Sequence, residues 1–232
     1  MLYMLSLAVV LLLGLMLLRR RRYNIPVGKA ILIMVLVAGL GILSTQMLYL
    51  IENGEWGGMS FFGAVLFLPL IMTPIALLLH VSAENMMDFI APPGLLMFAV
   101  MKTNCFFSGC CGGRVLTIGT KGATMIFPSQ LVEAGVTIVL ILALLLFEYK
   151  EKTRTKLYPI SMVSYGILRF ILNWFRMPGD ALVLGMQKGT VWSVVAVIIG
   201  VFWLMIMKNK ELDEQLVHLQ QKQLSDTLPE GK

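Results

Sequence analysis

The chain has 232 residues, of which 58% are hydrophobic, and its mean hydropathy is +0.83. A water-soluble domain does not need so much apolar sequence, so the composition excludes an ordinary soluble protein and indicates a membrane protein. Attraction of basic loops to anionic lipid headgroups explains the formal net charge of +6, which makes a nucleic-acid partner unnecessary.

Seven apolar stretches approach the length of a membrane-spanning helix. A hydrocarbon layer about 30 Å thick needs about 20 residues in a helix, because lipid leaves no backbone group unpaired. The first stretch lacks a basic segment before it and a small-residue cleavage site after it, so we expect a retained helix. We therefore predict an all-α polytopic fold of about seven transmembrane helices. The stretches are Leu2–Leu18, Val27–Ile51, Ser60–His80, Phe89–Phe107, Pro128–Phe147, Leu157–Phe175 and Val191–Met207.

Basic residues are concentrated in alternate loops. They follow the first, fifth and seventh stretches, within Arg19–Arg22, Lys150–Lys156 and Lys208–Lys210. Since cytoplasmic loops retain an excess of Lys and Arg, we predict an outside N-terminus and a cytoplasmic C-terminus. Three segments are expected: 1–25 as the first helix and a basic cytoplasmic loop, 26–207 as a membrane domain, and 208–232 as a polar tail that is amphipathic or disordered.

Polar side chains recur on one face of the sixth stretch. Tyr165, Arg169, Asn173 and Arg176 are spaced by four, four and three residues, which is the periodicity of one helical face. Ionisable groups inside a membrane are costly unless they are paired or line a wet cavity. This face is therefore predicted to point into the bundle.

Further polar residues are expected at the same depth, on the outer side of the membrane. Lys102 lies near the outer end of the fourth stretch, and Gln130 and Glu133 lie near the start of the fifth. Together these residues predict a cavity of net positive charge, suited to an anionic lipid headgroup because Arg binds phosphate oxygens bidentately. In the alternative interpretation, Glu133 pairs with Arg169 or Lys102 only to hold the bundle together.

The segment Ser108–Arg114 combines small residues with a cysteine pair. Its glycines could shape a nest of amide groups that binds an anion, or simply a tight turn. Cys105, Cys110 and Cys111 are expected to be free thiols or to form one disulfide through Cys105, because bonding between adjacent cysteines is strained. No histidine is nearby, so we expect no metal site, and no cofactor is expected.

Five sequence blocks resemble, in order and spacing, the prolipoprotein diacylglyceryl transferase family of bacterial membrane enzymes. The resemblance covers roughly residues 27–207. Gly58–Ala64 resembles the family pattern GLSFHGG, Asp88–Pro92 resembles D-x-x-A-P, Lys102–Arg114 resembles R-I-G-N-F-x-N-G-E-x-W-G-R, Phe127–Ala134 resembles H-P-[ST]-Q-L-Y-E-A, and Tyr165–Asp180 resembles Y-G-x-x-R-F-x-x-E-x-x-R-x-P-D.

The resemblance implies transfer of the diacylglyceryl group of phosphatidylglycerol to the lipobox cysteine of a prolipoprotein, in the bacterial cytoplasmic membrane. Phosphatidylglycerol, or a similar anionic phospholipid, and a prolipoprotein signal peptide are the partners that it implies. The catalytic residues would be Arg169, Tyr165 and Glu133. The substrate-binding residues would be Lys102, Arg114, Gln130, Asn173 and Arg176.

The sequence also departs from the family pattern. Phe62 and Phe127 stand where the pattern has histidine, and Lys102, Cys105 and Asn173 replace an arginine, an asparagine and a glutamate. One interpretation is a divergent transferase with another base, or a different transfer on the same lipid. In a variant of it, Cys105 or Cys110 takes up the transferred group covalently. The alternative is a non-catalytic phospholipid-binding scaffold or a small transporter.

The predicted orientation is tested by thiol labelling of intact cells. A cysteine at Gly54 should react with a membrane-impermeant reagent, whereas a cysteine at Thr153 should react only after the membrane is opened, because its loop carries the retained basic residues. Labelling of Thr153→Cys in intact cells would reverse the orientation.

Overall fold

The computed structural model describes residues 2–110, 112–118, 123–150, 156–177, 182–183 and 185–227. The predictions for Cys111, Lys152, Thr153, Arg154 and segment 178–180 fall outside these ranges. Within them the chain forms helices and two short antiparallel hairpins, β1 with β2 and β3 with β4. In chain order the elements are α1 (Leu2–Arg19), α2 (Val27–Asn53), α3 (Phe61–Leu78), α4 (Ala83–Phe107), β1 (Val115–Ile118), β2 (Ala123–Ile126), α5 (Ser129–Glu148), α6 (Leu157–Asn173), β3 (Leu182–Val183), β4 (Met186–Gln187) and α7 (Lys188–Thr227).

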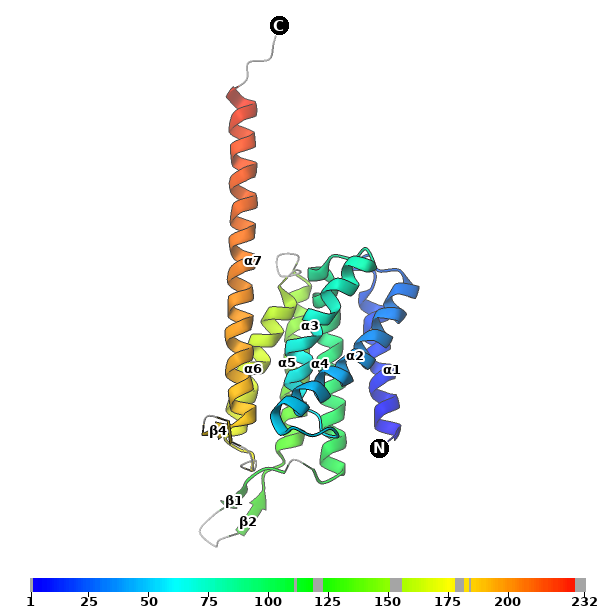
Figure 1. The fold of residues 1–232 in the computed structure, drawn as a ribbon, viewed down its shortest axis with the longest axis vertical. Coiled ribbons are helices and arrows are strands. Elements are labelled where there is room, and N and C mark those ends of the chain that lie inside the picture. Colours follow the sequence, from blue (N-terminus) through cyan, green and yellow to red (C-terminus); the bar gives the residue numbers. More distant parts are fainter. Residues whose placement is uncertain are drawn as a thin grey trace.

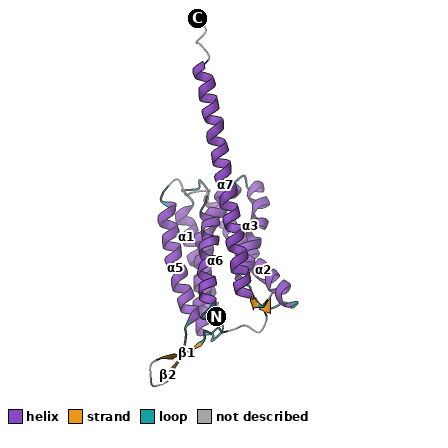
Figure 2. Ribbon diagram, turned by 90° about the vertical axis from the view of Figure 1, so that its left-hand side faces the viewer, coloured by secondary structure: helices purple, strands orange, loops and turns teal. Residues whose placement is uncertain are grey.

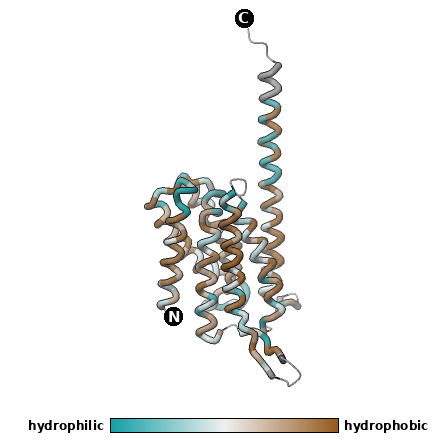
Figure 3. Tube along the Cα trace, turned by 180° about the vertical axis from the view of Figure 1, so that it is seen from behind, coloured by the Kyte–Doolittle hydropathy of each residue, from teal (hydrophilic) through white to brown (hydrophobic). Residues whose placement is uncertain are grey.

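The helices confirm the predicted all-α membrane fold. Five of those described, α2, α3, α4, α5 and α7, are long and apolar enough to cross a membrane. The apolar part of α1, Ser6–Arg19, is shorter, and α6 has 17 residues. Each predicted stretch thus coincides with a helix, while the number of crossings and their orientation stay predictions. Apolar residues dominate the middle of the bundle, and polar residues are frequent at its ends and along the part of α7 that extends beyond it (Figure 3).

Helix α4 lies at the centre of the bundle. It packs against α1, α3, α5 and α6, whereas α2 packs on α3 and α1 and runs obliquely across the bundle (Figure 1). The N-terminus and the β1–β2 hairpin lie at one end, and α7 extends beyond the other (Figure 2). The tail predicted to be amphipathic or disordered is helical as far as Thr227, in one continuous helix with the membrane-embedded part of α7.

Small residues let α7 approach α6 closely. A Cβ atom on Gly200 would lie 2.7 Å from Cγ2 of Val163, and one on Gly166 would lie 2.8 Å from Cγ2 of Val197. Such close approach is common between helices in lipid. Moving an apolar side chain from lipid to a protein surface gains little there, so close packing has to hold the helices together.

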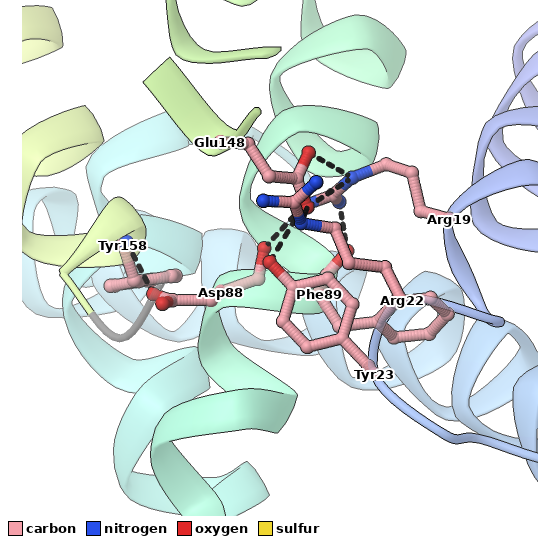
Figure 4. A network of polar contacts seen from close by, with 7 residues as sticks. All are labelled: Arg19, Arg22, Tyr23, Asp88, Phe89, Glu148 and Tyr158. Carbon is pink, nitrogen blue, oxygen red and sulfur yellow. Dashed lines mark hydrogen bonds and ion pairs between the residues drawn. The ribbon is translucent and has the colours of Figure 1, made fainter. Parts of the chain in front are cut away.

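A buried ion pair joins the helices at the end opposite the β1–β2 hairpin (Figure 4). The Arg19 guanidinium donates to Glu148, with Nε 2.9 Å from Oε2 and Nη2 2.7 Å from Oε1. It also donates to the backbone carbonyls of Phe89 and Asp88. Because Arg19 ends α1, Glu148 ends α5 and the two carbonyls belong to α4, a single side chain connects three helices.

Further residues extend this network (Figure 4), and Nε of Arg22 lies 3.9 Å from Oε1 of Glu148. The hydroxyl of Tyr23 accepts a bond from Arg19 at 3.2 Å, and the Asp88 carboxylate accepts one from the backbone N–H of Tyr158, in the first turn of α6, at 2.8 Å. Burial raises the pKa of the Tyr23 phenol well above its usual value, so the phenol stays neutral beside the ion pair. The network therefore reaches α6 as well.

Removing the Glu148 charge should destabilise the protein. Glu148→Gln leaves the Arg19 guanidinium buried without a counter-charge, and breaking a buried pair in this way costs about 3–5 kcal/mol. We expect a lower unfolding temperature in detergent for Glu148→Gln and no change for Glu55→Gln, which removes the same charge from an exposed loop position. Equal unfolding temperatures for the two variants would show that the pair contributes nothing to stability.

Candidate functional site

The carboxylate of Glu133 lies at the centre of a polar cluster near the hairpin end of the bundle. Glu133 is buried on the second turn of α5, and three cations surround it. The distances to Oε2 are 2.6 Å from Nη1 of Arg169, 3.1 Å from Nζ of Lys102 and 3.7 Å from Nη1 of Arg176. The Tyr165 hydroxyl donates to Oε1 at 3.1 Å.

Three helices contribute to this cluster. Lys102 comes from the last turns of α4, Tyr165 and Arg169 from α6, and Arg176 from the residues that follow α6. The four-residue spacing of Tyr165 and Arg169 thus turns both side chains toward α5, as the helical periodicity predicted. The prediction that Arg176 lies on the same helical face is wrong, because α6 ends at Asn173.

The charges in the cluster do not balance. Three cations meet one carboxylate, which leaves a formal excess of two positive charges among these four side chains. The carboxylate is enclosed, with 2% of its side chain exposed, whereas the cations keep 12% to 17%. The side chains of the cluster that an approaching anion can reach are therefore the cations and not the carboxylate.

Aromatic rings form one wall of the cluster. The rings of Phe61 and Phe98 stack at 3.8 Å, and both meet the Tyr165 ring edge-on, at 5.0 and 5.3 Å. Nζ of Lys102 lies 5.1 Å from the centre of the Phe98 ring. Phe62, at a position where the resembling pattern has histidine, is buried with its ring 5.8 Å from that of Tyr165. This wall keeps water away from Tyr165, which strengthens the electrostatic interactions beside it.

A short backbone pairing holds Arg176 in place. Gly113 forms an antiparallel bridge with Arg176, and the N–H of Arg114 donates to the Phe175 carbonyl at 3.0 Å. Gly113 also lies so close to Phe127 that a Cβ atom on it would be 2.1 Å from the Phe127 carbonyl oxygen. A glycine is therefore required here by space alone.

Three of the predicted site residues make their described contacts away from the Glu133 carboxylate. The Gln130 side-chain amide donates to the carbonyl of Cys110, and Nε of Arg114 donates to the carbonyl of Arg176 at 3.0 Å. The Asn173 amide donates to the hydroxyl of Thr190, on α7, at 3.4 Å. In this structure these side chains fasten the segments that surround the cluster.

The cysteine segment forms a helix-terminating turn. The N–H of Gly109 donates to Phe106 and that of Cys110 donates to Cys105, both at 3.1 Å, and Gly109 has a φ of 68°. This is the pattern of a Schellman motif, whose amides are occupied by the helix carbonyls. The tight-turn interpretation is thus confirmed, and an anion nest built from the Gly109 and Cys110 amides is wrong. Cys110 is a free thiol, and its sulfur lies 3.5 Å from the carbonyl oxygen of Cys105.

Neither histidine of the sequence belongs to the cluster. His80 follows α3 at the other end of the bundle, and His218 lies on the extension of α7. Among the described residues, no three His, Cys, Asp or Glu side chains are placed to hold a metal ion. The chemistry available at the cluster itself is that of cations, a phenol and one carboxylate.

Comparison with known proteins shows the family of this chain. The family profile described as prolipoprotein diacylglyceryl transferase matches residues 1–206. The chain belongs to the prolipoprotein diacylglyceryl transferase family. The resemblance inferred from the five sequence blocks is thereby confirmed, and the match also takes in α1. With its apolar helices, this member of the family is a multi-pass protein of the bacterial cytoplasmic membrane.

Relatives of this family member are phosphatidylglycerol–prolipoprotein diacylglyceryl transferases. The protein of Zymomonas mobilis is 30% identical over 173 residues, which are 67% of this chain and 59% of the relative. The protein of Acinetobacter baumannii strain ACICU is 30% identical over 178 residues, with shares of 67% and 64%. The protein of Idiomarina loihiensis is 33% identical over 178 residues, with shares of 71% and 65%. The chain therefore spans about three fifths of the length of these relatives.

The close approach at Gly113 gives a test of the site's construction. Gly113→Ala should push the Phe127 carbonyl away and disturb the pairing that holds Arg176, so we expect a lower unfolding temperature in detergent. Gly112→Ala is the matched control, because a Cβ atom there meets nothing within 4 Å. If the two variants melt together, the segment adapts freely and the pairing does not constrain Arg176.

Proposed function

We propose that this chain transfers the diacylglyceryl group of phosphatidylglycerol, or of a similar anionic phospholipid, to the lipobox cysteine of a prolipoprotein. The activity of the relatives supports the proposed reaction, and the charge of the Glu133 cluster supports a site for it there. The observation that carries the proposal is the excess of positive charge: three cations retain exposure around a carboxylate that has almost none. A phosphate diester is an anion that such a cluster would attract.

The proposed reaction forms one bond and breaks one. The acceptor sulfur bonds to the terminal glycerol carbon of the diacylglyceryl group, and the bond from that carbon to the phosphate oxygen breaks. The electron pair of the broken bond stays on the departing glycerol phosphate. The acceptor thiol loses its proton, and the departing phosphate, whose second pKa is about 6, takes it. The charge that develops on the phosphate in between is what the cations stabilise.

Arg169 is the residue that we assign to the leaving phosphate. Its planar guanidinium can bind Glu133 through one nitrogen and phosphate oxygens through the others. Tyr165 and Glu133 hold Arg169, Lys102 and Arg176 in fixed positions, so that the donors need no rearrangement during the reaction.

Arg114, Gln130 and Asn173 remain predicted substrate-binding residues. Their contacts in the structure support an indirect part, because Arg114 and Gln130 fasten the segment beside Arg176 and Asn173 fastens α6 to α7. Lipid binding would require them to exchange these partners.

A second candidate is a phospholipid-binding scaffold or a small transporter. It is favoured by the position of Phe62, whose ring packs on Tyr165 where the resembling pattern has a histidine. Both functions use the same cations, so the two proposals differ in one outcome: a transferase releases glycerol phosphate from the lipid, and a scaffold or a transporter does not.

The proposal is tested with purified protein, phosphatidylglycerol labelled in its headgroup, and a lipobox peptide. We expect release of labelled glycerol phosphate together with a lipidated peptide. Arg169→Lys keeps the charge and loses the planar fork, so the rate should fall roughly 100-fold, the usual effect of losing one transition-state donor. Arg21→Lys makes the same change at an exposed position near the other end of the bundle and should leave the rate unchanged.

Two results would contradict the proposal in different ways. Lipid binding without release would establish the scaffold or the transporter. Full activity in Arg169→Lys, combined with loss of activity in a folded Glu133→Gln, would make Arg169 a structural counter-ion and move the chemistry to the carboxylate.

A further inference from the structure

An unpartnered apolar stripe runs along α7, from its membrane-embedded part into its extension. Six apolar residues of this stripe, together with Asn209 between Met205 and Leu212, follow one another along the chain at spacings that alternate between four and three residues. Each of the six is 52% to 63% exposed. This is the spacing of the a and d positions of a coiled coil, sustained over three heptads. The six residues are Ile198, Phe202, Met205, Leu212, Leu216 and Leu219.

The opposite face of α7 is the one that packs on its own bundle. Ser193, Gly200 and Met207 are seven residues apart, which is the f position of the same heptads, and Ser193 and Met207 are buried while Gly200 lies against Val163 of α6. The a and d stripe points the other way. The face that meets the bundle and the face that carries the stripe are therefore separate.

Two ion pairs set the direction of α7 where it leaves the bundle. Lys210 lies 3.3 Å from Glu84, at the start of α4, and Glu211 lies 2.6 Å from Lys156, at the start of α6. Lys210 and Glu211 occupy the b and c positions, which lie on the side away from the stripe. The extension continues as one helix beyond this point, with no other element beside it in the described part of the chain (Figure 1).

Only the part of the stripe that lies in the polar segment of α7 needs a protein partner. Ile198, Phe202 and Met205 belong to the apolar part of α7, where lipid can cover them. Leu212 and Leu216 follow Lys208–Lys210 in a polar segment, where exposed leucines in a row are unfavourable in water and mark an interaction surface.

We propose that a second copy of this chain covers the stripe, through a parallel two-stranded coiled coil formed by the two α7 helices. Two copies inserted in one membrane share their orientation, so a symmetric pair must be parallel. In a parallel pair, Asn209 at an a position meets Asn209 of the other copy, an arrangement that fixes register and favours two strands. Lys208, at g, then faces Asp213 of the other copy, at e, and the two charges are opposite.

Disulfide cross-linking in native membranes tests this pairing. Leu216→Cys places a thiol in the seam, and its matched control, His218→Cys, places one on the far side of the same turn. Under mild oxidation we expect Leu216→Cys to give a disulfide-linked species of twice the monomer mass. This species should be several-fold more abundant than that from His218→Cys. The wild-type protein measures how much of it the native cysteines form. Equal yields, or an adduct with a protein of another mass, would overturn the pairing.

The charge pair provides an independent test in the Leu216→Cys background. Asp213→Lys sets two lysines against each other and should reduce the cross-linked fraction severalfold. Adding Lys208→Asp restores opposite charges with the signs exchanged, and the fraction should recover. A double variant as weak as the single one would show that the two positions do not face each other, and the parallel register would be wrong.

Discussion

The Glu133 carboxylate and its three cations determine how the hairpin end of this bundle is built. A carboxylate within a membrane helix is tolerated only when cations and donors surround it, and no single helix can supply them all. Lys102 must therefore come from α4, Tyr165 and Arg169 from α6, and Arg176 from the chain beyond α6. The requirement fixes the depth of α5, which carries Glu133. It also fixes the rotation of α6 about its axis, because rotating α6 by the angle between two successive residues would move Arg169 away from Glu133 and toward lipid.

The remaining features of this end serve the same charges. The strand-like contact of Gly113 with Arg176 delivers the third cation from outside the helices, and Gly113 leaves room for Phe127 beside it. The rings of Phe61, Phe62 and Phe98 close one side around Tyr165. With water excluded on that side, the excess charge lies on the three cations, which keep 12% to 17% of their side chains exposed and which a negatively charged molecule can neutralise.

Much of this could be predicted from the sequence, because the decisive constraints are local. Membrane thickness sets the length of an apolar stretch, and the helical period places Tyr165 and Arg169 on one face. The contacts of Arg114 and Gln130 depend instead on the path of loops, and sequence spacing carries no information about which carbonyl a side chain will meet. The contact of Asn173 with Thr190 depends on how α7 packs against α6, which the spacing within α6 does not show either. The inward position of Arg19 could not be predicted, because four consecutive arginines look alike. Only the fold places Arg19 at 2.7 Å and Arg22 at 3.9 Å from Glu148.

The separation of Arg19 from Glu148 along the chain has a consequence for the order of assembly. The two residues are 129 positions apart, so at about 5–20 residues per second the carboxylate is synthesised roughly 6–26 s after the guanidinium. During that interval the Arg19 cation has no carboxylate partner, and its donors can be solvated by headgroups, by water and, once α4 has been made, by the Phe89 and Asp88 carbonyls. The ion pair that ties the first helix to α5 can therefore form only after the helices between them have been made.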